Sequence, residues 1–233
     1  VKRICSAYGV DSADIFAIPS TIIVSITCQD KTYSKTRRLS VKGTDLDKVD
    51  RLNDLSRRMC REKPDYTTAK QMLSQVNAGK EYPLWMLCCA HGSAALIFAL
   101  FFGGNWKDGL WAFPIGVMIK LTSYWLGKRN ANSFFVTVIC GALSALLAGL
   151  GAQLHVIDQI SHVLMGAIMN LVPGLMLTNA MRDIMAGDFI AGLMRVAEAM
   201  LIGAGIAVGV MVPLSFFQPL LGKSSVRGDF LTC

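Results

Sequence analysis

Several residue patterns that define common enzyme and metal-binding classes are missing from this sequence of 233 residues. Its seven cysteines form no Cys-x-x-Cys pair and are not spaced with histidine as metal ligands would be, so neither zinc nor a disulfide framework is indicated. His-Glu-x-x-His, Gly-x-Ser-x-Gly and Walker sequences are also absent. We therefore predict a protein that is not an enzyme and that has no metal site and no cofactor.

Charged residues are scarce in the second part of the chain. Residues 1–83 contain 15 of the 23 Lys and Arg and 10 of the 16 Asp and Glu, whereas residues 84–221 are mostly Leu, Ala, Ile, Val, Gly and Met. A hydrophobic content of 53% is too high for an ordinary soluble domain. We predict a cytoplasmic domain at 1–83, a transmembrane transport domain at 84–221 and a tail at 222–233.

The net charge of +7 does not by itself indicate nucleic acid, because the basic residues are mixed with acidic ones and form no nucleic-acid-binding motif. A cytoplasmic domain beside an anionic lipid bilayer explains this charge. No nucleic-acid partner is predicted.

The first 83 residues carry the pattern of a small α+β domain. The β-branched stretch 15–28 predicts a strand, and 32–41 predicts a second strand that returns after a polar turn. Apolar residues at helical spacing predict helices over 45–61 and 67–78.

Five apolar segments follow, each close to the roughly 20 residues that a transmembrane helix needs. They occupy about 84–102, 109–126, 132–151, 159–177 and 189–214. The chain's tryptophans fall near the ends of these segments, as in an aromatic belt: Trp85, Trp106, Trp111 and Trp125. We predict an α-helical polytopic membrane protein with about five transmembrane helices.

Basic residues in the connecting segments predict the orientation. Lys128, Arg129 and Arg182 fall on the same side as residues 1–83, whereas 152–158 has no Lys or Arg and faces outwards. Lys107, on the outer side, is expected to be neutralised by Asp108. An odd number of spans leaves the two ends on opposite faces, which is unusual for a complete secondary transporter and indicates a missing half.

Five polar residues share one depth in the predicted bilayer. His91, Lys120 and Arg195 lie roughly 9–11 Å from the inner ends of their spans, and Asn170 and Glu198 lie roughly 11–15 Å deep. Ionisable groups at this depth are costly and usually mark the route of a polar solute. Alternatives remain: Lys120 can extend to the interface, His91 and Asn170 can bond a neighbouring helix, and Arg195 can neutralise Glu198.

Pro173-Gly174 predicts a discontinuous helix, because proline removes a backbone donor and frees carbonyl groups on the preceding turn. A kink that serves packing only is the alternative. Polar residues beyond this break are predicted to form a cytoplasmic mouth: Thr178, Asn179, Arg182, Asp183 and Asp188. Asp158 and His162 are expected at the outer interface, where they could receive protons.

The stretch Leu171–Ala199, with Leu-Val-Pro-Gly near its start and Met-Arg-Asp-Ile-Met-Ala-Gly-Asp in its middle, resembles the signature of the bacterial threonine/serine exporter family. Ala7-Tyr-Gly9, Ile18–Ser25 and Phe101-Phe-Gly-Gly104 are similar to that family too. Members are fused ten-span chains or pairs of separate subunits. This chain resembles the larger, five-span subunit of the split type, which is similar to the succinate exporter subunit.

The resemblance implies an exporter in the bacterial inner membrane that depends on the proton-motive force and works with a second membrane subunit. A small carboxylate is the expected cargo, either succinate or another dicarboxylate, or threonine and serine. Residues expected to bind it are Arg195, Lys120, Asn170, Pro173, Gly174, Thr178, Asn179 and Arg182. Residues expected to couple protons are Glu198, Asp183, Asp188 and His91.

Two other functions stay open, as does a higher oligomer. The chain could form an uncoupled channel or facilitator. It could also be a non-transporting membrane protein whose cytoplasmic domain binds a ligand.

Overall fold

The computed structural model describes residues 1–18, 20–39, 45–77, 82–129 and 131–217. Their contacts divide the chain into two compact units. The N-terminal unit comprises Val1–Glu81 with Asp183–Met194, and the helical unit comprises Tyr82–Arg182 with Arg195–Cys233. The predicted tail at 222–233 lies outside the described residues.

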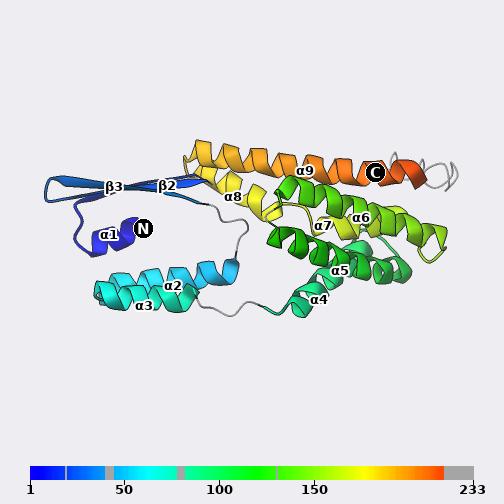
Figure 1. The fold of residues 1–233 in the computed structure, drawn as a ribbon, viewed down its shortest axis with the longest axis horizontal. Helices are drawn as coiled ribbons and strands as arrows, with labels where there is room; N and C mark the ends of the chain where they lie inside the picture. The colour runs from blue at the N-terminus through cyan, green and yellow to red at the C-terminus, as the bar shows by residue number, and fades with distance from the viewer. Residues whose placement is uncertain (19, 40–44, 78–81, 130, 218–233) are drawn as a thin grey trace. The chain divides into compact units, whose positions relative to one another are not determined.

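The N-terminal unit contains a three-stranded antiparallel sheet (Figure 1). Strands β1 (Ser12–Ile18), β2 (Thr21–Cys28) and β3 (Lys31–Arg38) pair in chain order. The prediction of a single strand over 15–28 is wrong, because β1 and β2 are antiparallel neighbours in which Phe16 pairs with Ile23 and Ile18 with Thr21. The returning strand predicted at 32–41 is confirmed as β3.

A two-residue turn joins β2 to β3. Gln29 and Asp30 both adopt positive φ angles of 49° and 60°, as a type I′ hairpin turn requires. The Asp11 carboxylate accepts a hydrogen bond from the Gln29 amide at 3.0 Å and so attaches the turn to the start of β1.

Three helices complete this unit: α1 (Lys2–Ala7), α2 (Leu46–Glu62) and α3 (Tyr66–Asn77). Asp45 caps α2 by accepting from the Lys48 amide, and Lys63, at φ 45°, ends it. Helix α1 packs against β1 and α2, and α2 packs against α3. The two helices predicted at 45–61 and 67–78 are confirmed, and they form a small α+β unit with the sheet.

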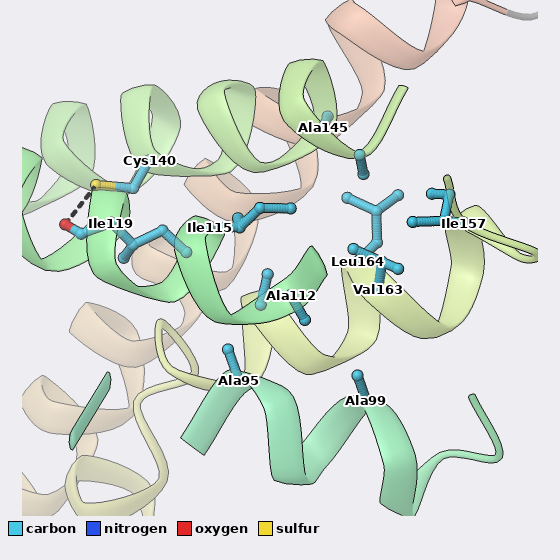
Figure 2. Packing of buried hydrophobic residues seen from close by; sticks show 12 residues of the cluster. Ala95, Ala99, Ala112, Ile115, Ile119, Cys140, Ala145, Ile157, Val163 and Leu164 are labelled. Carbon is cyan, nitrogen blue, oxygen red and sulfur yellow. Dashed lines mark hydrogen bonds between the residues drawn. The ribbon is translucent and has the colours of Figure 1, made fainter. Parts of the chain in front are cut away.

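The helical unit is built around α5. Its helices are α4 (Leu84–Phe101), α5 (Trp106–Lys128), α6 (Ser133–Gln153), α7 (Ile160–Met169), α8 (Gly174–Met185) and α9 (Phe189–Phe217) (Figure 1). Helix α5 packs against α4, α6 and α7. Figure 2 shows the core between them, in which alanines alternate with larger side chains such as Ile115 and Val163 in equal number.

Small residues allow these helices to approach closely. A Cβ atom at Gly166 of α7 would lie 2.6 Å from the Ala95 carbonyl oxygen of α4. On α9, Gly205 and Gly209 likewise allow a close approach to α6. A Cβ atom at Gly205 would lie 2.7 Å from the Thr137 hydroxyl of α6, and Gly209 faces the Val138 carbonyl.

Three helices of the described chain are long and apolar enough to cross a membrane, namely α4, α6 and α9. Helices α7 and α8 meet the same requirement only as a pair, bent by 53° at the break between them. The 23-residue α5 is long enough but not apolar enough, since it contains Lys120 and Pro114. The structure therefore supports three spans, or four with the bent pair, and five spans are not confirmed.

The tryptophans do not all lie as predicted. Trp85, Trp106 and Trp125 are exposed, as belt residues would be. Trp111 is instead half-buried and donates a hydrogen bond from Nε1 to the Leu147 carbonyl of α6 at 3.0 Å.

Candidate functional site in the helical unit

Helices α4, α5 and α7 meet at the backbone carbonyl of His91. Asn170 follows the last residue of α7, and its Nδ2 donates to the His91 carbonyl oxygen at 2.9 Å. Gly116 of α5 faces the same oxygen so closely that a Cβ atom there would lie 2.5 Å from it. The absence of a side chain at Gly116 is therefore what brings α5 to this junction.

The His91 side chain is oriented by its own helix. Its Nδ1 lies 3.0 Å from the Leu87 carbonyl. Since a carbonyl only accepts, Nδ1 carries the hydrogen, and Nε2 of the neutral ring is left as the acceptor. Lys120, one turn beyond Gly116 on α5, is half-buried. Of the predicted site residues, Asn170 and His91 are in contact, and Lys120 lies one turn along α5 from the Gly116 that faces the same carbonyl. We call His91, Asn170 and Lys120 the carbonyl junction.

The predicted break in the fourth apolar segment is confirmed. Helix α7 ends at Met169 and α8 begins at Gly174 after a change of direction. Pro173 cannot donate to the carbonyl one turn earlier, and its own carbonyl accepts from the Leu177 amide as α8 starts. Gly174 is exposed, and a Cβ atom there would meet nothing within 4 Å. The Asn170 side chain thus connects this break directly to α4.

Residues 178–188, which separate the fourth and fifth apolar segments, are helical as far as Met185. The helix then ends sharply. Gly187 has a φ of 93°, its amide donates to the Ile184 carbonyl, and the Asp188 amide donates to the Asp183 carbonyl. This is the Schellman pattern, which lets a polar helix end sharply.

The residues predicted to form the mouth therefore lie on or just after α8. Thr178 is exposed and donates to the Gly174 carbonyl at 3.0 Å, Asn179 is half-buried and Arg182 is exposed. Asp183 and the exposed Asp188 are grouped with the N-terminal unit.

Arg195 and Glu198 lie on α9, whose Ala199, Ile202 and Ile206 are buried. Arg195 is half-buried, whereas Glu198 is exposed. No hydrogen bond or ion pair of Glu198 is found among the described residues. No contact in the described part of the chain brings Glu198 to the carbonyl junction.

The sequence analysis missed Asp108. We expected it to neutralise Lys107, but Asp108 is buried and Lys107 lies 4.0 Å from Asp158 instead. Asp108 accepts hydrogen bonds from three backbone amides: Asn105, Asp158 and Gln159. An N-cap asparagine followed three residues later by an acid resembles a capping box, and this signal could have identified it.

The N-terminal unit contains a separate open groove of about 870 Å³ between α1, β1 and α2. Four basic side chains line it, and no acidic residue does: Lys2, Arg3, Arg57 and Arg61. We call it the basic groove.

Comparison with known proteins identifies the chain's relatives. A sequence profile of the threonine/serine exporter family, ThrE, matches residues 1–217. The "Probable succinate transporter subunit YjjP" of Klebsiella aerogenes is 25% identical over 217 residues, which are 92% of this chain and 83% of that protein. The "Threonine/serine exporter" of Corynebacterium glutamicum is 28% identical over 222 residues, which are 90% of this chain and 45% of that protein.

The "Probable threonine/serine exporter" of Mycobacterium tuberculosis shows the same difference in length, since its 25% identity covers 91% of this chain and 41% of that protein. The chain thus spans most of the first relative and less than half of the other two. No solved structure is significantly similar to it. Because the family profile covers almost the whole chain, this chain belongs to the threonine/serine exporter family.

Proposed function

We propose that this chain is one component of a secondary exporter for a small carboxylate-bearing metabolite. The observation that carries this proposal is the break between α7 and α8, linked by Asn170 to the carbonyl junction inside a highly apolar unit. Broken helices at membrane depth expose backbone polar groups, and they occur in transporters where a polar solute is bound. Family membership supports the same function.

In this proposal, Lys120 and Arg195 attract the substrate carboxylate, and Asn170, Pro173 and Gly174 line its site. Thr178, Asn179 and Arg182 on α8 guide it towards the break. Glu198 carries the coupled proton, and His91, Asp183 and Asp188 assist its transfer. A carboxylate is suited to this part because it is too short to extend to the interface from this depth.

We further propose that the chain lies in a bacterial inner membrane, with the N-terminal unit in the cytoplasm, and acts with a second membrane subunit. The length relation to relatives supports the partner, because the chain matches most of a protein named as a subunit and less than half of proteins named as exporters. The exposed position of Glu198 supports it too, since a carboxylate facing lipid would be costly. Between the two cargo classes, we favour a dicarboxylate such as succinate.

Uptake of radiolabelled succinate, threonine and serine into inverted vesicles tests this function, with this chain alone and with a co-expressed partner subunit. We expect accumulation of one substrate that needs the partner and is abolished by an uncoupler. Accumulation that ignores the uncoupler would indicate a facilitator. No accumulation of any substrate would contradict the proposal.

The proposed residues are tested in the same vesicles. Lys120→Gln should reduce uptake by at least about tenfold, because it removes a charge from an apolar site. Lys107→Gln is the matched control, since the Lys107 side chain is exposed. Glu198→Gln should abolish the uncoupler-sensitive part of the uptake. The melting temperature should stay unchanged, because Glu198 has no ion pair or hydrogen bond within the described chain. Unchanged export in both variants would contradict the assigned roles.

The basic groove favours a second function, in which the N-terminal unit binds an anion that regulates the chain. Four cations without a lining acid favour a phosphate or a carboxylate. Isothermal titration of the full chain in nanodiscs with phosphate and with succinate tests it. Arg57→Gln with Arg61→Gln should remove the binding, whereas Arg37→Gln with Arg38→Gln, on the exposed β3, should retain it. Binding that survives the groove substitutions would contradict this function.

A further inference from the structure

A buried carboxylate joins the start of α5 to the start of α7. The Asp108 side chain is 1% exposed. Its Oδ1 accepts from the Asp158 amide at 2.8 Å and from the Gln159 amide at 3.3 Å, and its Oδ2 accepts from the Asn105 amide at 3.1 Å. Gln159 is the N-cap of α7, so Asp108 supplies the acceptor for backbone donors at that helix start.

An imidazole lies beside this carboxylate without bonding to it. His162 Nδ1 is 4.0 Å from Asp108 Oδ2, which is too far for a hydrogen bond. The same Nδ1 atom is buried and has no hydrogen-bond partner among the described residues. A buried polar atom without a partner is costly, so this arrangement calls for an explanation.

The turn between α4 and α5 holds the imidazole in place. A Cβ atom at Gly104 would lie 3.0 Å from His162 Cβ and 2.7 Å from the Ala99 carbonyl oxygen, and one at Gly103 would lie 3.8 Å from His162 Nε2. Gly103 also has a φ of 95°. The Phe-Phe-Gly-Gly sequence therefore leaves room for this ring and keeps it against the carboxylate.

The surrounding charges leave the carboxylate without a cation. Lys107 is 70% exposed and faces Asp158, whose Oδ2 also accepts from the Asn105 side chain. Helix α6 contains no Asp, Glu, Lys, Arg or His, and the last two turns of α4 contain none either. His155, in the loop after α6, bonds the Gln153 carbonyl through Nδ1. His162 is thus the group best placed to neutralise Asp108.

We propose that Asp108 and His162 form a proton-binding site at this end of the helical unit. When the neutral His162 ring, which is 22% exposed, takes up a proton from hydronium and releases water, both Nε2 and the buried Nδ1 of the imidazolium carry a hydrogen. The resulting imidazolium then closes the 4.0 Å gap and donates to Asp108 Oδ2. The added bond ties α7 to α5, so protonation stiffens the contact between them. A part for this site in export rests on the proposed function, whereas proton binding itself does not.

The chain's three histidines make the site directly measurable. The full chain is labelled with ¹⁵N-histidine in lipid nanodiscs, and each ring is assigned with the variants His91→Gln, His155→Gln and His162→Gln. We expect the His162 nitrogens to change from the neutral to the protonated state as the pH is lowered. In Asp108→Asn, this transition should move down by about one pH unit, a tenfold loss of proton affinity. Asp158→Asn is the matched control and should move it less, because Asp158 is half exposed and faces Lys107.

Thermal stability provides a second test if Asp108→Asn does not fold. A histidine that gains a partner when charged stabilises the folded state at low pH, and that stabilisation is lost as the pH rises. The melting temperature of the wild type relative to His162→Gln should therefore rise on going from pH 8 to pH 5.5. His155→Gln should show no such dependence. A His162 ring that stays neutral down to pH 5, a transition unmoved by Asp108→Asn, or a pH-independent difference from His162→Gln would overturn the proposal. None of these measurements uses a substrate or a partner, so failure of the export function would not affect them.

Discussion

Substitution of Gly116 by alanine should separate α4 from α5 at the carbonyl junction. The new Cβ atom would lie 2.5 Å from the His91 carbonyl oxygen, 2.9 Å from Ala95 Cβ and 3.0 Å from Gly92 Cα. Ordinary contacts begin at 3.4 Å, so the two helices must move apart by about 0.9 Å (3.4 − 2.5). A backbone carbonyl and an alanine have no rotamer through which to relieve this contact.

Overpacking of this kind costs up to about 3 kcal/mol, and we expect the upper end because only backbone movement can accommodate the new atom. For a chain of this size, each kcal/mol lowers the melting temperature by about 2–4 °C, which predicts a fall of about 6–12 °C. Intrinsic tryptophan fluorescence of the chain in nanodiscs, recorded during heating, measures it. Export should fall as well, because Asn170 donates to the displaced carbonyl.

Gly203→Ala is the matched control for this substitution. Gly203 lies within α9, and a Cβ atom there would meet nothing within 4 Å. Alanine favours a helix over glycine by about 1 kcal/mol, so this variant should melt at or slightly above the wild type. The packing argument would be refuted if Gly116→Ala had the melting temperature of the wild type, or if Gly203→Ala lowered the melting temperature as much as Gly116→Ala does.

Three further predictions concern the N-terminal unit. Gln29→Asn with Asp30→Gly should stabilise the β2–β3 hairpin by about 1 kcal/mol, because the introduced asparagine and glycine both favour the positive φ angles of this turn. Slower amide exchange in β2 and β3 would show this stabilisation. Asp45→Ala should cost about 1 kcal/mol of α2 stability and speed exchange in its first turn; unchanged exchange would contradict the capping role. The Thr67 hydroxyl donates a hydrogen bond to the Asp65 carboxylate and holds the pKa of that carboxyl below its usual 3.8. The stabilisation of the folded state by this hydrogen bond is therefore present above pH 3.8 and is lost as the pH falls through the lowered pKa. Thr67→Val should raise the pKa of Asp65 towards 3.8, as a ¹³C carboxyl titration would measure.

The helices of the N-terminal unit could be predicted because local signals agree there. Residues 45–61 combine helical apolar spacing with an N-cap aspartate, and the structure places α2 at Leu46–Glu62. The single strand predicted over 15–28 failed because β-branched residues occur in both β1 and β2, on either side of the chain reversal. Propensity marks where strands form but not where one strand ends and the next begins.

Helix α8 was missed because its polar residues resemble those of a loop. Thr178, Asn179, Arg182 and Asp183 are all compatible with a helix, and the decisive feature is the left-handed Gly187 that ends it. Asp108 was missed for a different reason. Its neighbour Lys107 offers an obvious partner in the sequence, whereas its actual partners lie 50 and 51 residues away, at Asp158 and Gln159.

The rotation of each helix about its own axis was the property hardest to predict from the sequence. A sequence gives the depth of a residue in a helix at 1.5 Å per residue, but it gives the facing direction only when the helix is amphipathic. In α5 and α9, apolar residues are not confined to one face, so the common depth of five polar residues could not reveal which of them meet. The structure brings Asn170 to the His91 carbonyl because Gly116 and the break after α7 admit close contact, whereas Glu198 is exposed on α9. Glu198 is exposed on α9, so the proposed partner subunit is the first surface on which to seek the groups that contact its carboxylate.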